Sequence, residues 1–205
     1  MSLASTRLSE DPLQVIAGRR GHFQMESGYH SARWFDLDRL FMEPGRIAPH
    51  VAALAAGLAQ HRVEAVCGAM TGGAKLAELI AARLGVPAFF AERFEPSQPA
   101  GFFPVRYEIP AGSRAALCGK SVAIVDDAIS AGSAVRATYA DVLACGAIPV
   151  AIGALFAFGE NAKAFARSVG VPLETIVQLD FEMWPPVDCP LCRMRVNLEH
   201  VSENL

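Results

Sequence analysis

The stretch VAIVDDAISAGSA, residues 122–134, joins an apolar run to two adjacent acids and then to a turn of small residues. Its first four residues form a continuous apolar run, which is typical of a strand that is buried on both faces of a sheet. The turn ends in Ala131-Gly132-Ser133, and this combination of residues favours the start of a helix. The stretch therefore predicts a buried strand, a loop and a helix in succession.

The same alternation of apolar runs and helical patterns continues through the middle of the chain. Continuous apolar strands between helices of this length indicate a parallel sheet with helices on both faces. The predicted fold class is therefore a doubly wound α/β domain. We expect strands at 65–68, 88–91, 105–109, 121–125, 150–156 and 175–180, and helices at 51–60, 75–84, 133–144 and 161–169.

A chain of 205 residues fits one domain with small accessory parts. Two short strand patterns around a Ser27-Gly28 turn predict a small N-terminal lobe ahead of the core. The predicted parts are an N-terminal helix (12–20) and the two strands of this lobe (22–26 and 34–38) within 1–45, the core at 46–182, and a tail at 183–205.

Composition and charge exclude several classes of partner. The formal net charge is −3 and the basic residues are scattered singly, so we expect no nucleic-acid partner. No apolar run approaches the roughly 20 residues that cross a bilayer, and the N-terminus lacks the apolar core of a secretory signal. A small-molecule ligand, no membrane partner and a cytoplasmic location are the resulting expectations.

The five cysteines fall into two groups. Cys67, Cys118 and Cys145 lie inside or beside apolar segments, so we expect them in the core. Residues 189–192 read CPLC, which is half of a zinc-ribbon ligand set with only His200 nearby in the sequence. Because a single CxxC pair is weak evidence for a metal, a structural turn is the favoured interpretation and a bound zinc is the alternative.

Residues 126–133, here called the acidic loop, combine the parts of a phosphate site and a sugar site. The small residues let successive amides point into one concavity, and the following helix adds its positive end. The hydroxyls of Ser130 and Ser133 can supplement these amides, whereas Asp126 and Asp127 suit sugar hydroxyls or a metal. A phosphate beside a sugar diol describes a ribose 5-phosphate. The alternative is that these side chains only cap a turn and a helix.

A second loop, here called the glycine loop, also lies between a short strand and a helix. Its backbone amides suit an anion, although a flexible turn is the alternative. Both loops follow strands of one predicted sheet, and ligands of such sheets bind at the carboxyl ends of the strands. The glycine loop consists of Ala69, Met70, Thr71, Gly72 and Gly73.

Residues 122–134 resemble the signature of the type I phosphoribosyltransferases, which is a hydrophobic strand, two acids and a Thr/Ser-Gly-rich turn. The glycine loop is similar to the pyrophosphate loop of the same family. The resemblance implies that 5-phosphoribosyl-1-pyrophosphate (PRPP) is a substrate and that Mg²⁺ arrives with its pyrophosphate, without direct protein ligands. It further implies that Asp126 and Asp127 hold the ribose 2′ and 3′ hydroxyls, while Ala128, Ile129, Ser130, Ala131, Gly132 and Ser133 surround the 5′-phosphate.

Further stretches resemble the orotate phosphoribosyltransferases, especially their short-loop variant. They are GHF at 21–23 with SGYHS at 27–31, FAER at 90–93, and the pair PP at 185–186 with the CPLC knuckle. The resemblance implies a homodimer, a hood formed by the N-terminal lobe over the base, and a mobile loop at 94–104. The implied base contacts are Phe23, Ser27, Gly28, His30 and Arg33, and the implied catalytic residues are Arg93, Arg106, Asp126 and Asp127.

Several positions depart from the orotate pattern. Glu26 stands where many of these enzymes have a lysine, and the predicted mobile loop lacks the usual Lys and His. Ala157-Phe158 stands where the family that the chain resembles commonly has an Asp-Arg pair that contacts orotate. Arg33 is either a replacement for that arginine or part of a surface salt bridge, and His30 is either a substrate contact or a turn residue.

These departures leave three functions open. The leading hypothesis is conversion of orotate and PRPP to orotidine 5′-phosphate and pyrophosphate, a step of pyrimidine nucleotide synthesis. The first alternative is a phosphoribosyltransferase for another base. The second is a module that binds the sugar pyrophosphate or a nucleotide without turnover and regulates a partner.

Overall fold

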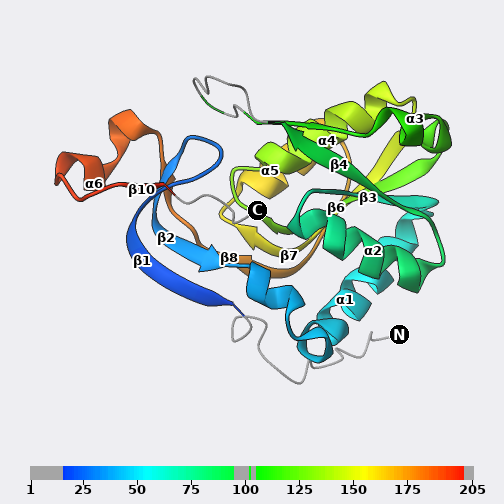
Figure 1. Cartoon of the computed structure of the whole chain (residues 1–205), viewed down its shortest axis with the longest axis horizontal. Coiled ribbons are helices and arrows are strands. Elements are labelled where there is room, and N and C mark those ends of the chain that lie inside the picture. The colour runs from blue at the N-terminus through cyan, green and yellow to red at the C-terminus, as the bar shows by residue number, and fades with distance from the viewer. Residues whose placement is uncertain (1–15, 95–101, 103–104, 201–205) are drawn as a thin grey trace.

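The computed structural model of the chain describes residues 16–94, 102 and 105–200. Figure 1 shows a parallel sheet with flanking helices on one side of the molecule and a smaller sheet on the other. The large sheet has the strand order β5-β4-β3-β6-β7-β8, and only β5 runs antiparallel to its neighbour. Its strands are β3 (Ala65–Ala69), β4 (Ala88–Phe94), β5 (Arg106–Glu108), β6 (Ser121–Ile129), β7 (Ile148–Phe158) and β8 (Leu173–Leu179).

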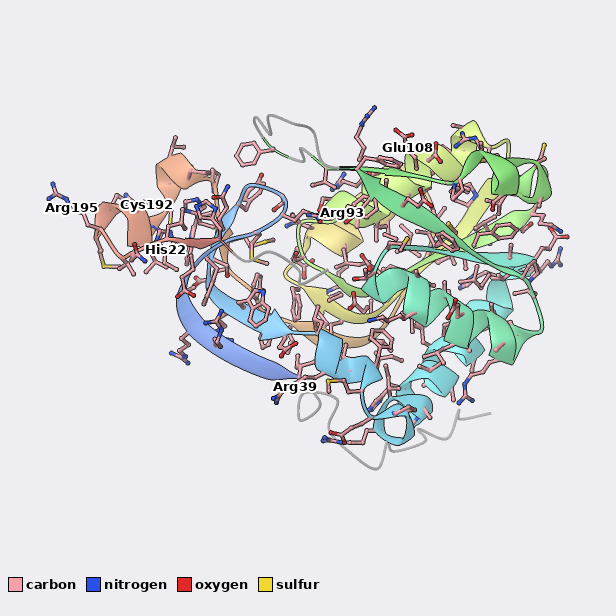
Figure 2. All side chains as sticks on the ribbon, in the orientation of Figure 1. His22, Arg39, Arg93, Glu108, Cys192 and Arg195 are labelled. Atoms are coloured by element: carbon pink, nitrogen blue, oxygen red, sulfur yellow. The ribbon has the colours of Figure 1, made fainter. Side chains whose placement is uncertain are left out.

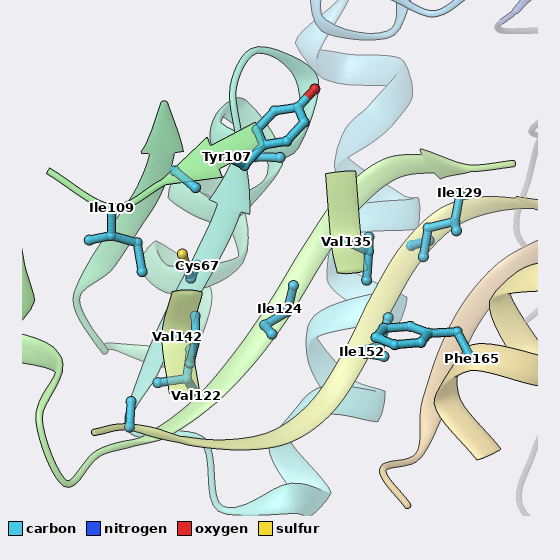
Figure 3. Packing of buried hydrophobic residues seen from close by; sticks show 14 of the residues in the cluster. Cys67, Tyr107, Ile109, Val122, Ile124, Ile129, Val135, Val142, Ile152 and Phe165 are labelled. Atoms are coloured by element: carbon cyan, nitrogen blue, oxygen red, sulfur yellow. The ribbon is translucent and has the colours of Figure 1, made fainter. Parts of the chain in front are cut away.

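Helices cover both faces of this sheet (Figure 1). The apolar residues of α1 and α2 pack with Val66, Ala123 and Val125 in one buried cluster. On the other face, α4 and α5 pack against Ile124 and Ile152 (Figure 3). The predicted doubly wound α/β fold is thus confirmed. The helices are α1 (Pro44–Leu58), α2 (Gly72–Leu84), α3 (Ala111–Leu117), α4 (Ser133–Ala144) and α5 (Asn161–Val169).

The hood is a separate four-stranded sheet with the order β10-β1-β2-β9. Its central hairpin comes from the N-terminal part of the chain, whereas both outer strands come from the tail. The hood and the tail therefore form one structural unit. Its elements are β1 (Ala17–Gln24), β2 (His30–Asp36), β9 (Met183–Trp184), β10 (Glu199–His200) and α6 (Pro190–Arg193); the 3₁₀ helices of the chain are η2 (Asp38–Phe41), η3 (Ala59–His61) and η4 (Pro186–Asp188).

The predicted N-terminal helix at 12–20 is wrong where the structure describes it. Residues 17–20 belong to β1 and pair antiparallel with residues 33–36 of β2. Pairing across the hairpin satisfies the same backbone groups that a helix would satisfy locally, and the tertiary partner decides between the two. Residues 12–15 lie outside the described part of the chain, as do 95–101, 103 and 104 of the predicted mobile loop.

Two further features of the core differ from the prediction. Helix α3 is present although the sequence predicted no helix there, because the proline-rich stretch before it gave no helical pattern. Cys118, expected in the core, is exposed because it follows the last residue of α3 and leads into a turn at Gly119. Cys67 and Cys145 are buried as expected, and burial raises the pKa of the Cys67 thiol to about 12.

The order of strands changes direction between β3 and β6. From β3 the chain passes through α2 to β4 on one side, and from β6 it passes through α4 to β7 on the other. The carboxyl ends of two such strands form a crevice, because the connections leave in opposite directions. Within the described residues no helix is long and apolar enough to span a bilayer.

Candidate active site

The glycine loop and the acidic loop are in direct contact at the carboxyl ends of β3 and β6. A Cβ atom added to Gly72 would collide with the carboxylate of Asp127. One added to Gly73 would lie 2.8 Å from Oδ1 of Asp126 and 2.9 Å from the Val125 carbonyl oxygen. Both glycines are therefore needed for the close approach of the two loops.

Strand β6 is longer than predicted and carries the two acids inside it. Asp126 pairs in register with Ala154 of β7, and its side chain is buried. The backbone N–H of Asp127 donates to Oδ1 of Asp126 at 3.2 Å, and the N–H of Ala128 donates to Oδ1 of Asp127 at 2.8 Å. These bonds orient both carboxylates at the sheet edge.

The turn between β6 and α4 is short. Gly132 has a φ of 82° at the residue before the helix, in the left-handed region that glycine adopts without strain. Helix α4 begins at Ser133 as predicted, but the hydroxyl of Ser133 donates to the Glu26 carboxylate at 2.9 Å and does not cap the helix. The positive end of α4 thus faces the hood as well as the acidic loop.

A cleft brings both loops together with the hood. It also takes residues from β2, β5, β7 and the segment after β8. Its lining residues are Met25, Glu26, Ser27, Trp34, Phe35, Asp36, Leu37, Ala69, Met70, Thr71, Gly72, Tyr107, Asp126, Asp127, Ala128, Ile129, Ser130, Gly132, Ser133, Ala134, Phe158 and Phe181.

One wall of the cleft is aromatic. The rings of Phe35 and Phe158 are stacked, with centroids 5.0 Å apart and an interplanar angle of 12°. Phe181 lies against Phe158 at 5.1 Å. Phe158 itself is only 4% exposed, so the half-buried rings of Phe35 and Phe181 that contact it supply the flat apolar surface on which a heterocyclic base can stack.

Glu26 is the centre of a network that joins the hood to the core. Its Oε2 atom accepts from Arg93 Nε at 3.0 Å and from the Tyr107 hydroxyl at 2.9 Å, and its Oε1 atom accepts from Ser133. Figure 2 places Arg93 at the side of the core that faces the hood. Glu26, which departs from the pattern described in the sequence analysis, therefore neutralises a neighbouring arginine.

The lining of the cleft is acidic. Glu26, Asp36, Asp126 and Asp127 line it, and among residues 16–94, 102 and 105–200 no lysine, arginine or histidine does. Of the two predicted catalytic arginines, Arg93 pairs with Glu26 next to the cleft. The side chain of Arg106 is 75% exposed and lies 3.5 Å from Glu108.

The predicted base contacts are divided between the cleft and other parts of the hood. Ser27 lines the cleft, and Gly28 follows it in the turn with a φ of 84°. Phe23 is fully buried and Arg33 is exposed, and neither lines the cleft. His30 contacts His22 and Cys192 at the outer end of the hood, where burial and then His22 lower the pKa of His30.

The sequence did not single out most of the cleft residues from β2 and β5. The aromatic wall was also missed, although Phe158 was noted as a departure from the family pattern. A usable signal existed for Phe158, because it follows the carboxyl end of a predicted strand, where ligands bind. For Phe35 and Tyr107 there was none, because a period-two strand pattern does not say which face meets a ligand.

Comparison with known proteins places this arrangement in a family. No family model matches the chain. The orotate phosphoribosyltransferase of Thermotoga maritima is 31% identical over 181 residues, which cover 87% of this chain and 88% of the relative. The chain belongs to the orotate phosphoribosyltransferase family. The family member from Caldanaerobacter subterraneus is 29% identical over 190 residues, covering 92% of this chain and 90% of the relative.

Solved structures agree with this membership. An orotate phosphoribosyltransferase from Aeropyrum pernix aligns with a TM-score of 0.60 and 25% identity over 79% of this chain and 88% of that one. An adenine phosphoribosyltransferase from Rhodothermus marinus aligns with a TM-score of 0.64 over 82% of this chain and 96% of that one, and its 19% identity shows the fold alone. The predicted resemblance to type I phosphoribosyltransferases and their orotate branch is confirmed.

Proposed function

We propose that the protein converts orotate and PRPP to orotidine 5′-phosphate and pyrophosphate. The observation that carries the proposal is the contact between Gly72 and the Asp127 carboxylate, which joins the two loops of the family signature at one crevice. A substrate bound there would meet amides, hydroxyls and carboxylates together, as a phosphorylated sugar requires. Membership of the orotate phosphoribosyltransferase family supports the same activity.

The reaction is a displacement at the anomeric carbon of the ribose. The bond from this carbon to pyrophosphate breaks, a bond to a ring nitrogen of orotate forms, and that nitrogen loses its proton to solvent. We assign Asp126 and Asp127 to the ribose hydroxyls, residues 128–133 to the 5′-phosphate and the glycine loop to the pyrophosphate. The chain then contributes positioning and electrostatic stabilisation, with no covalent intermediate on a side chain.

The acidic lining of the cleft fits Mg²⁺, a hard cation that prefers oxygen ligands. We expect the ion to be held by the pyrophosphate of the substrate, without direct protein ligands, since Asp126 and Asp127 are assigned to the ribose hydroxyls. Bound there, Mg²⁺ supplies the positive charge that neutralises the departing pyrophosphate. Because no cationic side chain lines the described cleft, we expect a strict requirement for this ion.

The proposal is tested by pyrophosphate release from PRPP and Mg²⁺ in the presence of orotate, uracil, adenine, guanine, hypoxanthine or no base. We expect pyrophosphate to be released only when orotate is the base. Activity with another base and silence with orotate would move the protein to a different branch of the phosphoribosyltransferases.

A sensor without turnover is the second candidate function, and one observation favours it. The carboxylate of Glu26 neutralises Arg93, the predicted catalytic arginine nearer to the cleft. Binding of PRPP in calorimetry together with silence across the whole base panel would support the sensor. Turnover with any base would exclude it.

The aromatic wall leads to a prediction about the base. Phe158→Ala removes the ring that stacks on Phe35 and contacts Phe181. We expect the KM for orotate to rise about tenfold, since a stacked aromatic contact with its buried area contributes about 1–2 kcal/mol. The KM for PRPP should stay within about twofold, a change of under roughly 0.5 kcal/mol.

Steady-state kinetics with each substrate varied in turn checks this prediction. Phe156→Ala is the matched control, because Phe156 is buried in the same cluster on β7 and does not line the cleft. An equal rise of both KM values in Phe158→Ala would show that the ring supports the cleft as a whole and not the base site.

The homodimer and the cytoplasmic location stay predictions. The homodimer is carried by the resemblance to the family, and light scattering of the purified protein tests it. The absence of nucleic-acid partners is carried by the net charge of −3.

A further inference from the structure

Four side chains from distant parts of the sequence meet at the outer end of the hood. They are His22, His30, Cys189 and Cys192, and their nitrogen and sulfur atoms all lie within 4.8 Å of one another. Figure 2 shows His22 and Cys192 close together on the side of the hood away from the parallel sheet. We propose that these four residues bind one structural Zn²⁺ ion. This proposal does not depend on the transferase activity.

Four of the six distances between the ligand atoms lie within about 0.3 Å of those in a tetrahedral site. The Nε2 atom of His22 lies 3.0 Å from Nδ1 of His30, 3.4 Å from Sγ of Cys189 and 3.7 Å from Sγ of Cys192. Sγ of Cys192 lies 3.3 Å from Nδ1 of His30. Tetrahedral zinc with its usual bonds to nitrogen and sulfur places such atoms roughly 3.3–3.8 Å apart. Small shifts of the side chains would admit the ion.

The other nitrogen of His22 is held as zinc-binding histidines are held. Nδ1 of His22 lies 2.9 Å from the carbonyl oxygen of Val196. Because a carbonyl can only accept, Nδ1 carries the proton and donates it, which leaves a lone pair on Nε2. A backbone carbonyl in this role fixes the tautomer and orients the ring toward a metal.

The competing interpretation is a cluster held by hydrogen bonds alone. Such a cluster cannot give every one of its polar groups a suitable hydrogen-bond partner. Three groups approach Nε2 of His22, namely Nδ1 of His30 and the thiols of Cys189 and Cys192. If Nδ1 of His30 donates to the one lone pair of Nε2, neither thiol has a ring nitrogen left as acceptor. If Nδ1 of His30 instead accepts from the Cys192 thiol at 3.3 Å, the lone pairs of the two ring nitrogens face each other at 3.0 Å. A cation at its centre satisfies all four residues at once.

Local structure explains why the residues converge. The β1–β2 pairing shifts register between Arg20 and Phe23, and His22 lies in this irregular segment, where a bulge can redirect a side chain. The two cysteines have the C-x₂-C spacing of zinc knuckles at the start of α6. Three of the four residues are buried: His22, His30 and Cys189.

A zinc ion at this site would connect the tail to the turn between β1 and β2 of the hood. Residues 25–27 line the cleft and lie between the two histidines in the sequence. A zinc ion that holds both ends of this segment would fix its position over the substrate. We therefore expect loss of the ion to raise the KM for orotate more than it lowers kcat.

The first test is metal content. The full chain is expressed with zinc in the medium, purified with a non-thiol reductant and measured by mass spectrometry. We expect one zinc per chain in the wild type and in Cys118→Ser, the matched control in which an exposed cysteine outside the cluster is replaced. Cys192→Ser and His30→Ala should each bind zinc more than about 100-fold more weakly, because loss of a direct ligand costs more than the roughly 10–100-fold lost with an outer-shell partner.

The second test removes the ion. A strong chelator should lower the Tm of the wild type by about 5 °C or more, and Zn²⁺ but not Mg²⁺ should restore it. Cobalt in place of zinc should give the absorption bands of a tetrahedral thiolate site.

Two results would overturn the proposal. One is a reduced wild-type protein that contains no zinc and binds none in a titration. The other is zinc retained with unchanged affinity in both Cys192→Ser and His30→Ala. Either would establish the hydrogen-bonded cluster instead.

Discussion

Replacing Asp126 and Asp127 together by asparagine should lower kcat/KM for orotate and PRPP by about 10³-fold, since each charged hydrogen bond contributes roughly 2 kcal/mol. Asparagine has nearly the same shape as aspartate, so the contact with Gly72 and Gly73 is kept while the two negative charges are lost. The ribose hydroxyls would then donate to weaker acceptors. Steady-state kinetics measures the effect, and calorimetry with PRPP shows how much of it is lost binding.

Glu160→Gln is the matched control for charge. Glu160 pairs with Lys163 on the surface and its side chain is 70% exposed, so removing its charge should leave kcat/KM unchanged. The far-UV circular dichroism of the double variant should equal that of the wild type. Near-normal activity of a folded double variant would remove these acids from the assigned sugar site.

The second large effect is expected for Gly72→Ala. The added methyl group collides with the Asp127 carboxylate, so the glycine loop or the acid must move. Since misplacement of a catalytic group by about 1 Å can cost 10²-fold, we expect kcat/KM to fall by about that factor. The chain should stay folded, because the collision involves a side chain at the edge of the sheet.

Gly112→Ala separates a steric effect from a general effect of removing glycine. Gly112 lies in α3, and a Cβ atom there meets no other atom within 4 Å. This variant should keep full activity and should be slightly more stable, since alanine favours a helix by about 1 kcal/mol. Full activity of Gly72→Ala would mean that Asp127 can leave its position without consequence, which would contradict the assigned role of that acid.

The sequence was sufficient for the core and for the two loops because their signals are local. A continuous apolar run at 122–125 identifies a buried parallel strand, and small residues after it identify a turn into a helix. Two such strand ends in one sheet then imply one crevice. The structure extends β6 through the acids to Ile129, which the sequence could not indicate because Asp126 and Asp127 are poor strand formers.

The hood was harder to predict because its partners are remote in the sequence. Residues 17–20 become a strand only because β2 is available to pair with them, and β9 and β10 arrive from the tail. The same distance concealed the proposed zinc site. The CPLC knuckle showed one half of a ligand set, and nothing in a single sequence joins His22 and His30 to it.

The composition of the hood sheet has a consequence for synthesis on the ribosome. Every strand of the parallel sheet precedes residue 180, whereas the hood needs β9 and β10, which lie at 183–200. A growing chain can therefore complete its parallel sheet while the hood still lacks both outer strands and the cysteines of the tail. The acidic loop and the glycine loop would then form before the hood that lies over them. A nascent chain would pass through a stage in which the cleft is open and incomplete.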